Sequence, residues 1–330
     1  MRAVMCHELG GPDKLRLQEV ASPAVGPGQV RLSVHAAAFN FLDTLIIRGQ
    51  YQDRPELPFV PGAEAAGRIM EVGEGVSHLK PGQAAIALCG TGAFAEEVVA
   101  DAQRVIPIPD SLPMPLAASI ATAYGTSFYA LREQASLQVG ETLLVLGAAG
   151  GVGLAAVELG KLMGARVIAA AGSDEKLAAA RKAGAVATVN YRSEDLRSKV
   201  KQITDGKGVD VVYDPVGAEL AEPSVRSLAW GGRYLVVGFA GGAIPALPLN
   251  LLLLKGASAI GVFWGAWVQR DPAGAAAGFR QLLAWIAEGK LRPVIRESYP
   301  LEQFEKGFLS LQNRKAVGKV VLTMTDPGQE

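Results

Sequence analysis

The segment at residues 142–153, TLLVLGAAGGVG, constrains this chain more than any other stretch of its sequence. Apolar residues at 143–146 have the length of a buried strand, and residues 152–163 repeat apolar side chains with helical periodicity. Glycines at such a turn permit a tight bend, a close approach of the backbone to a pyrophosphate, and close packing of helix on strand. The segment therefore predicts the first unit of a dinucleotide-binding fold, with an ordinary turn of another α/β protein as the alternative. Its glycines are Gly147, Gly150, Gly151 and Gly153.

Length, charge and cysteine content narrow the class of protein. The chain has 330 residues, enough for two domains, and its hydrophobic fraction of 49% allows a large core. Lys plus Arg and Asp plus Glu number 32 each, and this zero net charge argues against nucleic acid as a partner. The two cysteines, Cys6 and Cys89, can form neither a disulfide framework nor a zinc knuckle. With no signal-peptide pattern and no apolar run long enough for a bilayer, we expect a cytoplasmic protein without a membrane partner.

Short strands dominate the first third of the chain. Alternating or apolar runs there are separated by turns rich in Gly and Pro, such as residues 26–28 and 80–82. Many short strands at this spacing predict a small β-barrel. The runs lie at residues 2–5, 15–18, 29–36, 67–72 and 84–88.

From about residue 115 onward, buried strands alternate with helices, which predicts a parallel sheet covered on both faces. A helical pattern at 114–132 precedes the glycine segment, and helices at 272–289 and 301–313 and a strand at 319–323 follow the sheet. We predict an α/β protein with a doubly wound Rossmann domain at 121–269 and a first domain at 1–120 that residues 270–330 complete. After the glycine segment, strands are expected at 166–171, 187–191, 209–214, 233–239 and 258–264.

Short motifs spread from residue 40 to residue 322 carry a family resemblance. They read NFLD at 40–43 with RGQY at 48–51, PFVPG at 58–62, AAGGVG at 148–153, DPVG at 214–217 and GKVVL at 318–322. Together they resemble the zinc-independent medium-chain dehydrogenases/reductases of the quinone oxidoreductase group. The resemblance implies a GroES-like β-barrel domain, a Rossmann domain, and a site in the cleft between them. The segments at 48–52, 170–176 and 228–230 point to one branch of the group.

The resemblance also implies that Asn40, Asp43 and Tyr51 are the catalytic residues facing the nicotinamide. Asn40 is expected to hydrogen-bond a substrate oxygen or the cofactor, and Tyr51 to donate a proton or bind an acceptor carbonyl. For Asp43, the alternative is a structural role as the N-cap of a helix at 44–48. Family members often have a tyrosine two positions after the aspartate, where this chain has Leu45, a departure that bears on quinone specificity.

The residues after the second Rossmann strand predict which dinucleotide binds. An NAD-dependent enzyme usually has an acid there to bind the ribose hydroxyls, whereas this chain has Gly172 and Ser173. The resemblance assigns the 2′-phosphate to Lys176 and Tyr191, with an ordinary solvated helix position as the alternative for Lys176. We therefore predict NADP(H) as the cofactor. The other positions that match cofactor-contacting residues are Asn40, Thr126, Gly150, Gly151, Val152, Val216, Gly238, Phe239, Phe263 and Lys319.

We expect a site without a metal. Zinc-dependent members of the superfamily carry a histidine where Ala63 stands and a cysteine near where Asn40 stands, and the three histidines here lack paired ligand spacing. Quinones and α,β-unsaturated carbonyls need little electrophilic help, so they are the expected small-molecule substrates of an NADPH-dependent oxidoreductase. The alternatives are an enoyl-thioester (acyl-CoA) reductase and a cofactor-binding protein with little catalysis.

The apolar run at residues 258–264, SAIGVFW, predicts a homodimer. It is the last strand of the expected sheet and has no Lys, Glu or Pro to protect its edge. Pairing with its own copy across a two-fold axis would satisfy both edges, and the family resemblance implies the same arrangement. The alternatives are an interior strand and an edge covered by the helix after Pro272.

Overall fold

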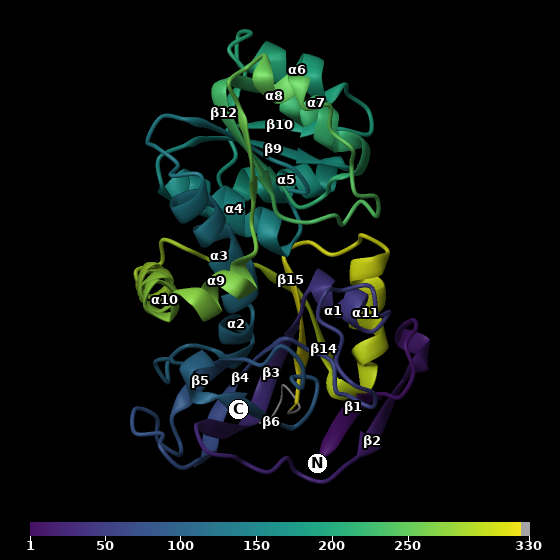
Figure 1. The fold of residues 1–330 in the computed structure, drawn as a ribbon, viewed down its shortest axis with the longest axis vertical. Helices are drawn as coiled ribbons and strands as arrows, with labels where there is room; N and C mark the ends of the chain where they lie inside the picture. The colour runs from purple at the N-terminus through teal and green to yellow at the C-terminus, as the bar shows by residue number, and fades with distance from the viewer. Residues whose placement is uncertain (325–330) are drawn as a thin grey trace. The chain divides into compact units, whose positions relative to one another are not determined.

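The computed structural model describes residues 1–324 and divides the chain into two units (Figure 1). The first unit comprises residues 1–122 and the segment from Pro293 onward, and the second comprises residues 123–292. No helix within the described residues is both long enough and apolar enough to cross a membrane.

The first unit is built on a sheet of seven strands in the order β14-β15-β3-β4-β5-β7, with β6 also pairing with β3. Strands β1 and β2 form a separate antiparallel pair. The strands are β1 (Arg2–Cys6), β2 (Leu15–Glu19), β3 (Gln29–Phe39), β4 (Glu64–Val72), β5 (Ala84–Leu88), β6 (Glu97–Asp101), β7 (Val105–Pro107), β14 (Ile295–Pro300) and β15 (Lys319–Thr323). Its helices are α1 (Phe41–Ile46), α2 (Met114–Ala118) and α11 (Phe304–Gln312).

Strand β3 is the central element of this unit. Its side chains alternate between buried and half-buried over most of its length and are all buried from Ala36 to Phe39. The Phe39 ring packs against Phe94 and Phe308, with centroid distances of 4.6 and 5.1 Å. The C-terminal segment returns to this core, because β15 pairs antiparallel with β3 and β14 pairs parallel with β15.

The second unit is built on a parallel sheet in the order β10-β9-β8-β11-β12-β13, which is the Rossmann order 3-2-1-4-5-6. The strands are β8 (Thr142–Val145), β9 (Arg166–Ala171), β10 (Ala187–Asn190), β11 (Val209–Asp214), β12 (Leu228–Val236) and β13 (Ser258–Gly261). The helices are α4 (Gly151–Leu162), α5 (Asp174–Ala183), α6 (Leu196–Ile203), α7 (Ala221–Arg226), α8 (Asn250–Leu253), α9 (Trp264–Arg270) and α10 (Pro272–Ala287). Helix α3 (Ala121–Phe128) enters this unit from the first one and continues as a π-helical turn, Tyr129–Gln134.

The predicted α/β fold class with a Rossmann sheet is confirmed, although several boundaries differ. The sixth strand ends at Gly261 and not at residue 264, because Phe263 caps α9. The fifth strand runs from 228 to 236 and not from 233 to 239. The helical pattern at 114–132 is two helices, α2 and α3, which are separated at Ser119 and Ile120.

The division between the units also lies later than the expected residue 269. Helices α9 and α10 belong to the second unit, which therefore extends to Arg292. Aromatic packing explains this placement: Trp285 of α10 lies 6.0 Å from Phe128, and Trp267 of α9 stacks on Tyr129 at 4.6 Å, measured between ring centroids. Only the segment from Pro293 onward completes the first unit.

Candidate active site

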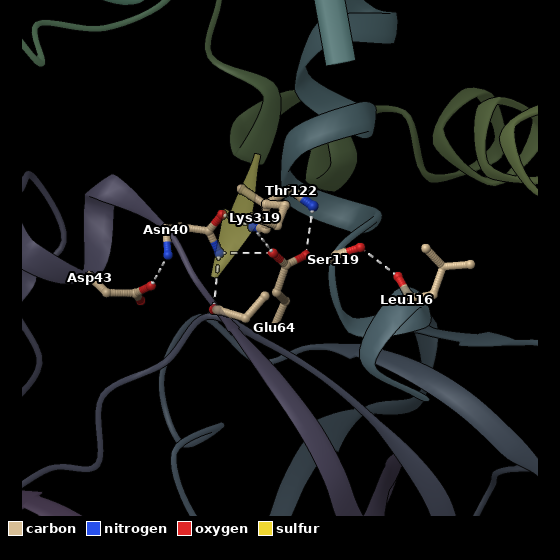
Figure 2. A network of polar contacts seen from close by, with 8 residues as sticks. Asn40, Asp43, Glu64, Leu116, Ser119, Thr122 and Lys319 are labelled. Carbon is tan, nitrogen blue, oxygen red and sulfur yellow. Dashed lines mark hydrogen bonds and ion pairs between the residues drawn. The ribbon is translucent and has the colours of Figure 1, made fainter. Parts of the chain in front are cut away.

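A network of buried polar side chains occupies the first unit (Figure 2). The Lys319 ammonium donates to Asn40 Oδ1 at 2.6 Å and to Glu64 Oε1 at 2.8 Å. Asn40 Nδ2 donates to the same Glu64 oxygen at 2.9 Å, so the three side chains form a closed triangle. The other carboxylate oxygen of Glu64 accepts the Thr122 backbone N–H at 2.7 Å.

Strand pairing explains why these three side chains meet. Asn40 follows β3, Glu64 begins β4, and Lys319 begins β15. In the register of the sheet, Glu64 pairs with Ala38 and Val320 pairs with Phe39, so all three residues lie at one end of neighbouring strands. Residues far apart in the sequence are thereby fixed within hydrogen-bonding distance.

The network contains a buried ion pair whose polar atoms are nearly all satisfied. Glu64 is 0% exposed and Lys319 4% exposed. A buried pair of this kind is tolerated only where further hydrogen bonds satisfy both charges, and Glu64 accepts three such bonds. An ammonium has three N–H donors, and the Lys319 ammonium uses two of them on the described residues, so its third N–H has no partner among them.

Asp43 belongs to the same region but has a different position from the one expected. Asn40, not Asp43, is the N-cap of the short helix α1, and Asp43 is its third residue. Asp43 Oδ2 accepts the Asn40 backbone N–H at 2.7 Å, as in a capping box. The other oxygen, Oδ1, is buried and has no hydrogen-bond partner of good geometry among the described residues. Burial raises the pKa of Asp43 to about 7 against the opposing effects of the Asn40 N–H and the Lys319 charge.

The structure does not bring Tyr51 into this hydrogen-bond network. Its ring is half-buried and packs against the core of the first unit, and its hydroxyl makes no hydrogen bond within the described residues. Burial, reinforced by the charges of Asp53 and Asp43, raises the pKa of Tyr51. The phenol therefore stays protonated at neutral pH and can donate a hydrogen bond.

In the second unit, the predicted cofactor-binding residues lie at the carboxyl ends of the strands. Each of the six parallel strands is followed by at least one of them. Thr126, on α3, is the exception, and Asn40 and Lys319 lie in the first unit. Ligands of open α/β sheets bind at the carboxyl ends of the strands, where the strand order reverses. The residues are Gly150, Gly151 and Val152 after β8, Gly172, Ser173 and Lys176 after β9, Tyr191 after β10, Val216 after β11, Gly238 and Phe239 after β12, and Phe263 after β13.

The glycine turn has the close packing that its sequence predicts. Gly150 is the N-cap of α4. A Cβ on Gly153 would lie 2.2 Å from the Gly147 carbonyl oxygen, whereas a Cβ on Gly150 would meet only that oxygen, at 3.5 Å. Gly153 thus permits the helix to pack on the turn, and Gly150 leaves its own surface open.

A second loop, Pro215–Gly217, packs beside the glycine turn and is held by Asp214. Asp214 Oδ1 accepts the backbone N–H groups of Val216 and Gly217 at 2.7 and 2.8 Å, and Oδ2 accepts the Tyr234 hydroxyl. A Cβ on Gly147 would lie 2.9 Å from the Val216 side chain, so the two loops are in contact. Asp214 is the first residue of the DPVG motif, for which the sequence predicted no role. An acid at the end of an apolar strand was the feature that could have indicated one.

At the end of β9, Gly172 and Ser173 stand where an NAD-dependent enzyme usually has an acid, and the acids Asp174 and Glu175 lie in the first turn of α5. Ser173 Oγ accepts the Lys176 N–H at 3.4 Å and caps α5. Asp174, the nearest acid, accepts a hydrogen bond from Asn190 Nδ2 at 2.9 Å. A Cβ on Gly172 would lie 3.2 Å from both the Tyr191 ring and Arg192 Nε. These contacts add Arg192, which sequence reasoning missed, to the residues beside the strand end.

Glu64 is the other site residue that the sequence did not predict, although it directly follows Ala63 and the PFVPG motif. The available signal was a carboxylate at the head of the apolar strand EAAGRIM. Among residues 1–324, no three His, Cys, Asp or Glu side chains converge as a set of metal ligands.

Two family models match the chain in the order of its units. Residues 26–110 match the alcohol dehydrogenase GroES-like domain, and residues 151–288 match the model described as zinc-binding dehydrogenase. A GroES-like unit with a Rossmann unit that has the glycine turn is the organisation of the medium-chain dehydrogenases/reductases, a superfamily of oxidoreductases.

Relatives narrow the assignment within that superfamily. The chain is 42% identical to the bovine (Bos taurus) quinone oxidoreductase-like protein 2 over 324 residues, covering 98% of this chain and 92% of the relative. It is 33% identical to the human (Homo sapiens) quinone oxidoreductase, covering 98% of both chains. The chain belongs to the quinone oxidoreductase family, and the branch indicated at residues 48–52, 170–176 and 228–230 is that of quinone oxidoreductase-like protein 2.

Solved structures agree with this assignment. The Escherichia coli quinone oxidoreductase complexed with NADPH is 30% identical, covers 98% of this chain and 100% of its own, and has a TM-score of 0.92. The quinone oxidoreductase of Pseudomonas syringae is 31% identical over 98% of this chain and 99% of its own, also with a TM-score of 0.92.

Proposed function

We propose that this protein is an NADPH-dependent oxidoreductase that transfers hydride to a quinone or an α,β-unsaturated carbonyl without zinc. The observation that carries the proposal lies at the carboxyl ends of the Rossmann strands, where the glycine turn after β8 and the pair Gly172-Ser173 after β9 follow neighbouring strands. Membership of the quinone oxidoreductase family and the NADPH complex of the E. coli relative support it.

The residues present fit NADP(H). Gly150 leaves the start of α4 open for a pyrophosphate, which the free N–H groups and the dipole of the helix favour. At the end of β9, Gly172 and Ser173 place no carboxylate where it would repel a 2′-phosphate, and Lys176, Tyr191 and Arg192 are the groups that would bind it. When bound, NADPH supplies the hydride.

The buried network of the first unit supplies the hydrogen-bond donor that stabilises charge on the acceptor. Hydride addition to a quinone or an enone places negative charge on its oxygen, and a preorganised donor stabilises that charge. Lys319 has an uncommitted N–H and is held by Asn40 and Glu64. Asn40 uses its amide on Glu64 and Lys319, so we assign the donor role to Lys319 and a positioning role to Asn40. Tyr51 is the candidate that delivers the proton.

Two features of the network support independence from zinc. Ala63 stands where zinc-dependent relatives have a histidine, and Asn40 stands near their cysteine. Asn40 Oδ1 is bound by the Lys319 ammonium at 2.6 Å, and a resident cation disfavours a second one beside it. Elemental analysis of the purified protein should find well under one zinc per chain; one equivalent would contradict this part of the proposal.

A substrate panel tests the chemistry. NADPH oxidation is measured with quinones, with enones and with saturated aldehydes, and the reverse reaction with NADP⁺ and primary alcohols. We expect turnover of quinones or enones, with a Tyr51→Phe variant losing turnover while it binds NADPH as tightly as the parent protein. If primary alcohols are the best substrates, or if no acceptor is reduced, the proposed reaction is wrong.

Cofactor preference is tested separately. We expect NADPH to bind at least about tenfold more tightly than NADH, which corresponds to about 1.4 kcal/mol. Lys176→Ala and Arg192→Ala should each weaken NADPH binding and leave NADH binding unchanged, because only NADPH has the 2′-phosphate. Lys182→Ala, at the opposite end of α5, is the matched control. Equal affinities for the two dinucleotides in the parent protein would contradict the assignment.

We also propose that the protein is a homodimer. Strand β13 is at the end of the Rossmann sheet, and Ser258, Ala259 and Gly261 are exposed. The segment that precedes β13 in the sequence also exposes apolar side chains, of the kind that an interface covers. These are Ile244, Leu249, Leu253 and Leu254.

A further inference from the structure

A pocket lies at the amino ends of the Rossmann strands, whereas the glycine turn lies at their carboxyl ends. It has a volume of about 310 Å³ and adjoins Gly208 and Leu228, where β11 and β12 begin. The glycine turn and the Pro215–Gly217 loop follow the other ends of their strands. In Figure 1, α6, α7 and α8 lie close together in the second unit. The pocket is therefore separate from the proposed cofactor site.

The charged side chains that line this pocket are all positive. Its lining includes Arg197, Lys201, Lys207, Arg226 and Lys255, and no acidic residue is among the described residues that line it. Arg226 is paired with Glu222 at 2.7 Å, and Lys255 donates to the backbone oxygens of Arg226 and Leu228. The side chains of Arg197, Lys201 and Lys207 are exposed and form no ion pair or hydrogen bond within residues 1–324, although the charge of Arg197 acts on the neighbouring Asp195. Three cations without a direct partner therefore line one small volume.

Helix electrostatics account for only part of this cluster. Lys201 and Arg226 lie in the last turns of α6 and α7, where a cation interacts favourably with the helix dipole. Arg197 is in the first turn of α6, where the dipole disfavours a cation, and it is four residues from Lys201 on the same face. Burial, together with the positive charge of Arg197, also lowers the pKa of Lys255. The cluster is self-repelling, and an anion in the pocket would relieve the repulsion.

An aromatic side chain completes the pocket. Trp230 is 82% exposed, which is unusual for so large an apolar ring. A Cβ on Gly256 would lie 3.4 Å from the Trp230 ring, so the indole lies over that glycine and the rest of its surface is open. A flat aromatic surface beside several cations suits a ligand that carries both a planar ring and phosphates.

We propose that this pocket is a second ligand site, which binds a nucleoside diphosphate or a molecule of the same chemistry. Lys201, Lys207 and Arg197 would bind the phosphates, and Trp230 would stack on the base. The site is independent of the proposed reaction, because none of these residues is among those assigned to NADPH or to the acceptor.

Calorimetric titrations of the NADPH-saturated protein test the proposal, since bound NADPH prevents the probes from entering the cofactor site. The probes are ADP and inorganic tripolyphosphate, each titrated at low and at moderate salt. We expect both to bind, with affinity that falls as salt rises. Lys201→Glu should weaken both probes about tenfold or more. Lys182→Glu is the matched control, since Lys182 occupies the last turn of α5 as Lys201 occupies that of α6, and it should change affinity by less than about twofold.

A second variant tests the aromatic part. Trp230→Ala should weaken ADP by about fivefold or more and leave tripolyphosphate unchanged, because only ADP has a ring to stack. Equal effects on the two probes would overturn the assignment of the base to Trp230. Absence of binding by either probe at millimolar concentration, or equal weakening by Lys201→Glu and Lys182→Glu, would overturn the site as a whole.

Discussion

At the scale of single residues, the fold favours the protonated, uncharged form of the Asp43 carboxyl group. The side chain is completely buried, and one of its oxygens lacks a well-formed hydrogen bond among the described residues. Burial disfavours the charged form more strongly than Lys319 favours it, so the pKa rises to about 7. An unfolded aspartate has a pKa of about 3.9, so the folded state holds an extra proton between these two values.

This extra proton makes stability depend on pH in a stated direction. Because the folded state binds more protons in this window, the free energy of unfolding falls as pH rises from about 4 to about 7. Asp43→Asn keeps an oxygen for the Asn40 N–H but cannot ionise. Between about pH 4 and about pH 8, the parent protein should lose on the order of 2–4 kcal/mol relative to this variant. Urea unfolding of both proteins across that range measures the difference, and parallel pH profiles would contradict the raised pKa.

The Lys319–Glu64 pair gives a second prediction at this scale. Lys319→Met leaves the fully buried Glu64 carboxylate without its cation, which should cost about 3–5 kcal/mol of unfolding free energy. Adding Glu64→Gln removes the orphaned charge, so the double variant should be more stable than Lys319→Met alone. Denaturant unfolding of the parent, both single variants and the double variant forms a complete cycle. If the two losses are simply additive, the pair is not coupled as described.

At the scale of elements, two glycines of the glycine turn have different roles: Gly153 permits packing, and Gly150 leaves space for the ligand. Gly153→Ala places a Cβ 2.2 Å from the Gly147 oxygen, so the backbone must shift, at a cost of about 1–3 kcal/mol. Gly150→Ala has its nearest contact at 3.5 Å and an ordinary extended backbone, so its stability should change by less than about 0.5 kcal/mol. Its new methyl group instead occupies the space proposed for the pyrophosphate.

Binding and unfolding measured on the same two variants test this separation. Gly150→Ala should raise the NADPH dissociation constant about tenfold or more while it unfolds at the parent denaturant concentration. Gly153→Ala should unfold at a lower denaturant concentration. A Gly150→Ala protein that binds NADPH normally would show that the phosphates do not lie at the start of α4.

Sequence patterns predicted the Rossmann elements well and the polar network only in part. The strands at 142–145, 166–171 and 209–214 are apolar runs close to glycine or helix-capping residues, and such signals can be read from the local sequence alone. Glu64 joins Asn40 and Lys319 only through the register of β3 with β4 and β15, which no local pattern encodes. Arg192 was missed for the same reason, because its proximity to Gly172 depends on the pairing of β9 with β10.

At the scale of the whole molecule, the proposed dimer depends on which backbone groups of β13 are free. The Val262 N–H donates to the Val236 oxygen of β12 at 2.9 Å, so it faces the interior of the sheet. Backbone groups alternate sides along a strand, so those of Ile260 also face β12 and those of Ala259 and Gly261 face the open edge. A partner strand would therefore pair with Ala259 and Gly261.

Proline at the outward position tests this interface selectively. Ala259→Pro removes an N–H that no strand of the same sheet uses, and its ring opposes an incoming strand, so a dimer of 34.4 kDa chains should dissociate. Ala259→Val is the matched control, because it keeps the N–H and favours a strand, and it should remain dimeric. Light scattering at micromolar concentration measures the mass of each protein, with circular dichroism to verify that both variants are folded. A parent protein that is monomeric at this concentration, or an Ala259→Pro variant that is folded and still dimeric, would show that β13 does not form the interface.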